Sequence, residues 1–186
     1  QIGLGSCYRL MARTSNGRGN YEHSMNLLLK AKTIFEKENF SIGIGRVYET
    51  IGDINDIFGD YNSALENLTN SVQIKEENKD FLELSRSYAY LGNVYSHLGN
   101  FDEALKNFNE ALRLSKVTFN LNAESYVLTK LGDFYFNLKD YDQSIDNYMK
   151  SLEITKLHSN TWGKIRNQQG IGNNFYLKKD YSDAIR

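Results

Sequence analysis

The 186-residue sequence contains no proline and only one cysteine, Cys7. Proline is the strongest breaker of helices, so its absence predicts a chain that is helical over nearly its whole length. A single cysteine excludes an internal disulfide and a zinc site built from cysteines. It also fits a reducing compartment, and we therefore expect a cytoplasmic protein.

The chain also lacks a strong excess of charge and any long apolar run. Its formal net charge is -1, which gives no overall field that would attract nucleic acid or an acidic membrane surface. No apolar stretch is long enough to span a bilayer, and there is neither a secretory signal nor an initiating methionine. We expect a piece of a longer protein that has neither nucleic acid nor a membrane as its partner.

Side chains of the catalytic and metal-binding types do not occur in useful patterns. The three histidines, His23, His97 and His158, have no metal-ligand spacing, and no paired carboxylates or catalytic triad can be assembled. Cys7 has no histidine close to it and is expected to be a small packing residue beside Tyr8. We therefore expect no enzyme activity, no metal and no cofactor.

What the chain does contain is a repeat with a period of forty residues. An apolar residue followed by glycine recurs at 51–52, 91–92, 131–132 and 171–172. Each unit also has a turn residue that can cap a following helix: Asn20, Asp60, Asn100, Asp140 and Asp180. A period without insertions predicts a single repeat array over 1–186. Its units are approximately 1–38, 39–78, 79–118, 119–158 and a truncated 159–186.

Each unit is predicted to be a pair of antiparallel helices. In the third unit the small residues Gly92 and Ala104 allow the two helices to approach closely, and Phe108 fills the space beside them. A glycine within a helix costs about 1 kcal/mol relative to alanine, so its recurrence implies a gain in packing. Glu103 follows the cap residue Asn100 by three positions, which is typical of a capping box.

The third unit resembles the tetratricopeptide repeat through Tyr88, Leu91, Gly92, Tyr95, Ala104, Phe108 and Ala111. The resemblance implies an all-α fold, a right-handed superhelical α-solenoid of stacked antiparallel helix pairs. The usual spacing of that family is about 34 residues, and its common proline is absent here. The longer unit, with Leu-Gly-Asn at 91–93, is similar to a forty-residue subtype seen in cell-polarity adaptors and in sensory arms of bacterial cyclases and kinases.

In arrays of this family the first helices line the concave surface, so the resemblance implies a groove with one set of side chains per unit. Each first helix can be projected at about 100° per residue to find the face opposite its core stripe. The candidate peptide-binding residues on that face are Arg46, Thr50, Asp53, Arg86, Tyr90, Asn93, His97, Tyr126, Lys130, Asp133, Asn137, Arg166 and Asn173.

Two hypotheses account for the recurrence of arginine, and of Asp or Asn, on this face. In the first, Asp53 pairs with Arg86 of the next unit, and a ladder of such pairs sets the angle between units. In the second, asparagines hold the backbone of an extended peptide and arginines hold a carboxylate. Basic residues outnumber acidic ones at these positions, so an acidic segment is the favoured ligand, although Glu49 is predicted to lie at the groove edge.

The leading hypothesis is a protein-interaction module that binds an extended or helical peptide within a larger signalling or adaptor protein. The alternative is an architectural or dimerising arm of a bacterial signalling enzyme whose catalytic domain lies outside this sequence. The last unit stops inside its second helix, so we expect the chain to continue past Arg186. Trp162, at the start of a first helix, is expected to pack against the preceding unit.

Overall fold

The computed structural model describes residues 1–157 and 161–178, and this part of the chain contains nine α-helices and no strand. The helices are α1 (Ile2–Gly17), α2 (Tyr21–Lys37), α3 (Ser41–Ile57), α4 (Tyr61–Glu77), α5 (Phe81–His97), α6 (Phe101–Val117), α7 (Leu121–Asn137), α8 (Tyr141–Leu157) and α9 (Thr161–Leu177). From α2 onward each helix begins forty residues before its counterpart in the next unit, as the repeat predicts.

Parts of the last unit lie outside the described residues. These are the expected turn at 179–181 with its cap Asp180, the small residue Ala184 and the final residue Arg186. His158 also lies outside them. The last unit is therefore described only through α9 and the residue after it.

The turn inside each helix pair is formed by a change in backbone conformation followed by a cap. The backbone is left-handed, with φ between 75° and 77°, at Gly19, Gly59 and Gly99. In the third unit the side chain of Asn100 then accepts a hydrogen bond from the N–H of Glu103 at 3.5 Å. The carboxylate of Glu103 pairs with Lys106, so only one half of the expected capping box is present.

The recurring glycines lie where the two helices of a pair touch. A Cβ atom added to Gly92 would lie 2.8 Å from the ring of Phe108, and one added to Gly132 would lie 2.8 Å from the ring of Tyr148. Real Cβ atoms do not approach other atoms so closely, so a larger residue at either position would force the neighbouring ring to shift. Ala104 is fully buried in the same contact. The predicted close approach of the two helices is confirmed.

Two packing predictions are wrong. Cys7 is exposed, whereas Val47 and Val127, its equivalents in later units, are fully buried. Val47 packs in one cluster with Ala12, Leu28 and Phe35 of the unit before it, whereas α1 contacts only α2 and α3, which follow it. Trp162 is 80% exposed, although it lines a hollow together with residues of α7.

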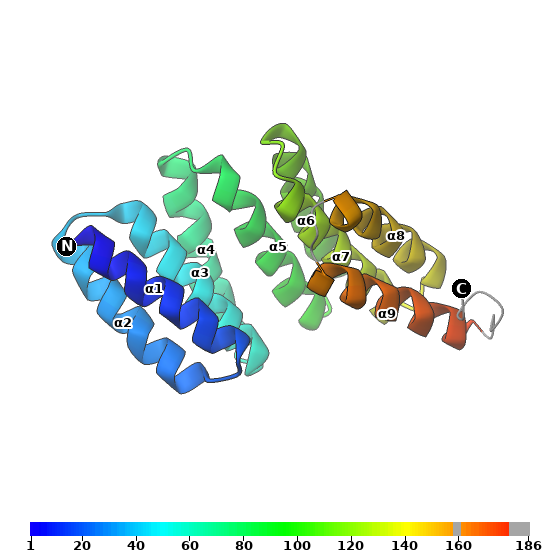
Figure 1. Cartoon of the computed structure of the whole chain (residues 1–186), viewed down its shortest axis with the longest axis horizontal. Helices are drawn as coiled ribbons and strands as arrows, with labels where there is room; N and C mark the ends of the chain where they lie inside the picture. The colour runs from blue at the N-terminus through cyan, green and yellow to red at the C-terminus, as the bar shows by residue number, and fades with distance from the viewer. Residues whose placement is uncertain (158–160, 179–186) are drawn as a thin grey trace.

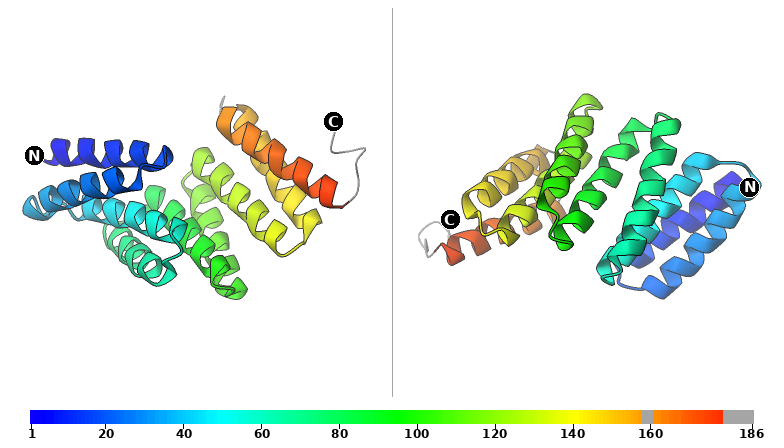
Figure 2. Two further views of the ribbon diagram at one scale, coloured as in Figure 1. Left: turned by 90° about the horizontal axis from the view of Figure 1, so that it is seen from below. Right: turned by 180° about the vertical axis from the view of Figure 1, so that it is seen from behind.

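The helix pairs follow one another in chain order, from α1 and α2 at one end to α9 at the other (Figure 1). Two further views show an elongated, curved stack (Figure 2). The buried apolar side chains form successive clusters along this stack instead of one central core. The described part of the chain is thus an all-α solenoid, as predicted.

The first helices of the units form the inner layer of the stack. Helices α1, α3, α5, α7 and α9 contact one another from unit to unit, whereas α2, α4, α6 and α8 contact only first helices. A stack of helix pairs curves toward the layer whose helices contact one another, so the first helices lie on the concave side. No helix in the described residues has both the length and the apolar character needed to cross a membrane.

Candidate functional site

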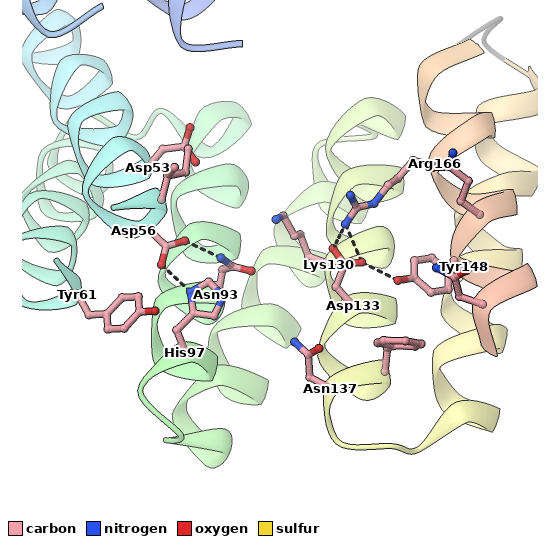
Figure 3. A pocket seen from close by; sticks show the side chains of 15 residues that line it. Asp53, Asp56, Tyr61, Asn93, His97, Lys130, Asp133, Asn137, Tyr148 and Arg166 are labelled. Atoms are coloured by element: carbon pink, nitrogen blue, oxygen red, sulfur yellow. Dashed lines mark hydrogen bonds and ion pairs between the residues drawn. The ribbon is translucent and has the colours of Figure 1, made fainter. Parts of the chain in front are cut away.

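The inner layer carries a groove made of three neighbouring hollows. The central hollow, of about 700 Å³, is lined mainly by α3, α5, α7 and α9 (Figure 3). The α7–α9 hollow, of about 530 Å³, shares Lys130, Asp133 and Arg166 with the central one. The α5–α7 hollow, of about 400 Å³, shares Tyr126 with the α7–α9 hollow and includes Arg13 from α1. The shared residues make the three hollows one continuous surface, which we call the groove.

Most of the thirteen candidate binding residues line this groove. The α5–α7 hollow contains Arg86, Tyr90 and Tyr126. The central hollow contains Asp53, Asn93, His97, Lys130, Asp133, Asn137, Arg166 and Asn173. Arg46 and Thr50 lie outside the three hollows: Thr50 is buried and donates to the carbonyl oxygen of Arg46 at 3.2 Å.

Some groove residues do not follow from the helical projection. Tyr148 belongs to a second helix, α8, and its ring is buried as a core residue should be. Its hydroxyl nevertheless reaches the central hollow and donates to Asp133 Oδ1 at 2.6 Å. The repeat pattern identifies Tyr148 only as a core position, so it does not reveal that the hydroxyl of this side chain reaches the groove. Asp56, in contrast, lies one turn after Asp53 and was within reach of the sequence pattern.

The predicted ladder of charged pairs forms at one step and fails at another. Arg166 donates to both carboxylate oxygens of Asp133, at 2.9 and 2.7 Å, as the ladder hypothesis requires. The proposed pair between Asp53 and Arg86 is absent. Arg86 Nε instead donates to Glu49 Oε1 at 2.6 Å, and Asp53 accepts from Asn16 Nδ2 at 2.8 Å. The offset between paired residues is therefore 37 in these units, against 33 at the last step.

Asp56 joins two units at the floor of the central hollow. Its carboxylate accepts from Asn93 Nδ2 at 2.6 Å and lies 2.7 Å from His97 Nδ1 (Figure 3). The ring of Tyr61 lies against that of His97, with 5.4 Å between the centroids. Two of the predicted binding residues, Asn93 and His97, are therefore held in fixed positions by α3.

A charged cluster is buried behind the groove where α3, α4 and α5 meet. Glu49, predicted at the groove edge, is 3% exposed, and Lys75 is completely buried. Ser87 donates to Glu49 and accepts from Lys75, each at 2.8 Å. Burial alone would raise the pKa of Glu49, but Lys75 and Arg86 outweigh it and hold that pKa at about 2. The pKa of Lys75 is lowered by its burial.

Asp53 is a carboxylate of the central hollow whose pKa is raised. Burial raises the pKa of Asp53 to about 6, against the opposing effect of its hydrogen bond from Asn16. Asp53 therefore changes its protonation state close to neutral pH. Among the described residues, no three His, Cys, Asp or Glu side chains are arranged to hold a metal ion.

A concave groove along stacked helix pairs defines the chain as a solenoid of the helical-repeat class. Models of the tetratricopeptide repeat match residues 44–117 and 125–156, which together make up more than half of the chain. The protein belongs to the tetratricopeptide repeat family, whose members are generally non-catalytic protein-interaction modules. No curated protein matches the sequence significantly.

Several solved structures share the fold. A signal transduction ATPase with numerous domains and a tetratricopeptide repeat sensor, from Pyrococcus horikoshii, has a TM-score of 0.73 at 18% identity over 98% of this chain. A Rap protein complexed with competence and sporulation factor has a TM-score of 0.82 at 11% identity over 96%. Aspartyl phosphate phosphatase F from Bacillus subtilis has 0.74 at 13% over 98%. The chain spans 29%, 50% and 52% of these three proteins, respectively.

Proposed function

We propose that the groove binds an extended peptide segment of a partner protein. The observation that carries this proposal is a row of side chains in the central hollow with unused hydrogen-bonding capacity. Asn137, Gln169 and Asn173 line the hollow, and none of the three side chains has a hydrogen-bond partner among the described residues. A carboxamide both donates and accepts, so such a row suits the alternating N–H and C=O groups of an extended backbone.

An acidic character of the ligand is supported by fewer residues than the sequence suggested. Arg86 and Arg166 are already paired with carboxylates of the chain itself. Lys130, in contrast, forms no ion pair in the described structure and lies over the ring of Tyr126, at 5.8 Å from its centroid. We propose that an acidic side chain of the peptide binds at Lys130, between the central and α7–α9 hollows.

Selection of peptides from a random library on the immobilised chain tests this proposal. Binders are then titrated by calorimetry against Asn173→Ala, Lys130→Ala and the control Asn26→Ala, an exposed asparagine on the outer helix α2. We expect each groove substitution to weaken binding about tenfold, the loss of one or two hydrogen bonds, and the control to have no effect. Failure to select any peptide, or equal binding by all three variants, contradicts the proposal.

A second candidate is a dimerising arm of a larger signalling protein. Apolar side chains are exposed where α6 and α8 end, with Phe119 at 89%, Leu157 at 77% and Val117 at 63% exposure. Contact with a second copy would remove these side chains from water. Light scattering during gel filtration tests this candidate: we expect a dimer that Phe119→Ser converts to a monomer. A monomer at all concentrations contradicts it.

A further inference from the structure

Helix α9 contacts the preceding unit through polar side chains at positions where earlier first helices use mainly apolar ones. Two positions of each first helix face the unit before it. They hold Val47 and Ile54 in α3, Ser87 and Val94 in α5, Val127 and Phe134 in α7, and Asn167 and Asn174 in α9. All eight side chains are buried, so the two asparagines occupy core positions. Among these four helices, α9 alone is polar at both positions.

The two asparagines attach α9 to α7 and α8 by hydrogen bonds. Asn167 Nδ2 donates to Ser151 Oγ at 2.8 Å, and its Oδ1 accepts from Thr129 Oγ1 at 2.9 Å. Asn174 Nδ2 donates to Ser144 Oγ at 3.0 Å, whereas its Oδ1 is buried and accepts no hydrogen bond. We call these contacts the polar seam. Its unmet acceptor is a cost of the arrangement seen in the structure.

A polar contact at the same place also joins α5 to its preceding unit, but there apolar side chains support it. Ser87 donates to Glu49 at 2.8 Å, as the equivalent pair in α9 and α7 does with the roles reversed. Leu84 and Val94 of α5 add apolar burial, because both belong to a cluster with side chains of α4. The α9 counterpart of Leu84 is Lys164, and that of Val94 is the second asparagine of the polar seam.

The other contacts of α9 with the preceding unit lie at the groove. Arg166 pairs with Asp133, and the Arg166 side chain is 48% exposed (Figure 3). The backbone at Gly170 lies against the ring of Tyr148, where an added Cβ atom would be 2.5 Å from Cζ. Among the described residues of α9, the two asparagines are the only buried ones. Hydrogen bonds therefore contribute more to the attachment of α9 than apolar burial does.

We propose that α9 alternates between the docked position seen in the structure and an undocked position in which water solvates the polar seam. Water replaces the hydrogen bonds of asparagine and serine at little cost, whereas exposed valine or phenylalanine would lose its full hydrophobic stabilisation. Undocking also provides a donor for the buried Oδ1 of Asn174. Arg166, Gln169 and Asn173 of α9 line the central hollow, so the hollow is complete only in the docked position. The control of peptide binding by this movement rests on the proposed function.

Replacement of both asparagines by valine changes the polar seam without leaving new unpaired groups. Thr129 and Ser151 keep an acceptor, because both hydroxyls also donate to the carbonyl oxygen of Ser125, at 2.9 and 2.7 Å. Ser144 likewise donates to the carbonyl oxygen of Gly132 at 2.8 Å. The double variant therefore gives α9 the kind of apolar contact that α3 and α7 already have.

Hydrogen exchange followed by mass spectrometry tests the movement without any peptide. We expect exchange in α9 to be at least about tenfold slower in Asn167→Val/Asn174→Val than in the wild-type chain, because the docked position gains apolar burial. Gln168→Val is the control, since Gln168 is exposed on the same helix, and it should leave the exchange of α9 unchanged. Exchange in the double variant that is equal to that of the wild type, or faster, overturns the proposal.

Distances between spin labels show the two positions of α9 directly. The labels are attached at Asp146 on α8 and Gln168 on α9, both exposed, in a chain with Cys7→Ser. We expect two distances in the chain with the native seam and loss of the longer one in Asn167→Val/Asn174→Val. Labels at Lys106 and Asp146, equivalent exposed positions on α6 and α8, are the control and should give one distance in both chains. A single distance between α8 and α9 with the native seam contradicts undocking.

Peptides selected on the groove separate this inference from the proposed function. We expect such a peptide to bind the double valine variant more tightly than the wild type, by the reciprocal of the docked fraction that the labels measure. A wild-type chain docked about one third of the time would bind about threefold more weakly than the variant. If α9 undocks but no peptide is selected, the movement remains and the peptide function fails. If α9 undocks and both chains bind the peptide equally, the movement does not control the groove.

Discussion

Lys75 is fully buried, with its ammonium group against the carboxylate of Glu49 and the hydroxyl of Ser87. Breaking a buried pair from one side leaves the other charge poorly compensated. We predict that Lys75→Met lowers the free energy of unfolding by about 3 kcal/mol, measured by urea denaturation. The exposed Lys37→Met is the control and should change stability by less than about 0.5 kcal/mol. A similarly small effect at Lys75 would mean that the pair makes no net contribution.

Glu49 in the same cluster predicts how stability changes in acid. Its pKa is about 2 in the folded chain, against an ordinary value of 4.5. The unfolded chain therefore takes up the proton first, so the contribution of Glu49 is complete above about pH 5 and is lost as the pH falls toward 2. We expect denaturation midpoints measured from pH 6 to pH 3 to fall less steeply for Glu49→Gln than for the wild type. Parallel curves would contradict the lowered pKa.

The raised pKa of Asp53 predicts the opposite change of stability with pH. Its pKa of about 6 lies above the ordinary 3.8, so the folded chain holds the proton more tightly than the unfolded chain does. Stability from this group is present below about pH 4 and is lost as the pH rises through 6. We predict that Asp53→Asn is more stable than the wild type by up to about 3 kcal/mol at pH 7 and by less than about 1 kcal/mol at pH 4. A difference that is the same at both values of pH would exclude a titrating Asp53.

At the scale of single residues, the sequence indicates which helix face a residue occupies but not the residue with which it pairs. The projection correctly brought Asp53 and Arg86 to one surface, yet their pairing depends on whether neighbouring units meet at an offset of 33 or 37 residues. That offset is set by side-chain packing between units. Glu49 was misplaced for a related reason: its equivalents Ala89 and Thr129 are uncharged, so no repeating pattern marks a buried carboxylate.

At the scale of the helix pair, substitution of Gly92 by alanine tests whether close packing outweighs helix propensity. A methyl group there would lie 2.8 Å from the ring of Phe108, whereas one at Gly3 in α1 would meet no atom within 4 Å. We predict that Gly92→Ala lowers the free energy of unfolding by about 2 kcal/mol, because overpacking exceeds the gain in helix propensity. Gly3→Ala should instead raise it, by up to about 1 kcal/mol. Urea denaturation measures both variants, and stabilisation of both would contradict the close helix contact.

The helix pairs themselves were well predicted, because period, cap and small residues all point to the same boundaries. The turns between units are the exception. Asn39, Lys79 and Phe119 adopt left-handed backbone conformations, with φ of 52°, 56° and 52°. No glycine marks these turns, so local sequence did not reveal them. The residue after each of them donates its backbone N–H to the last turn of the preceding helix: Phe40 to Phe35 at 2.8 Å, Asp80 to Lys75 at 2.9 Å and Asn120 to Ser115 at 2.9 Å.

The curvature that creates the groove is a property of the whole molecule. The family resemblance placed the first helices on the concave side, and contacts among α1, α3, α5, α7 and α9 agree. The division of the groove into three hollows was not predictable from the sequence. It depends on which long side chains form ion pairs within the protein. Arg166 pairs with Asp133, which lies in the central hollow. Arg86 pairs instead with Glu49, which is buried behind the groove.

The same arrangement predicts that the array does not unfold as one unit. Helices contact only their own pair and the adjacent units in the described structure, so stability is transmitted from neighbour to neighbour. Gly132→Ala would force a methyl group to 2.8 Å from Tyr148 and weaken the contact between α7 and α8. We predict that hydrogen exchange, followed by mass spectrometry, becomes about tenfold faster in α7 to α9 and stays within about twofold of wild type in α1 to α4. Gly3→Ala, whose methyl meets nothing, should not accelerate exchange anywhere. Acceleration of equal size in all helices would show that the units unfold together, and the nearest-neighbour description would then be wrong.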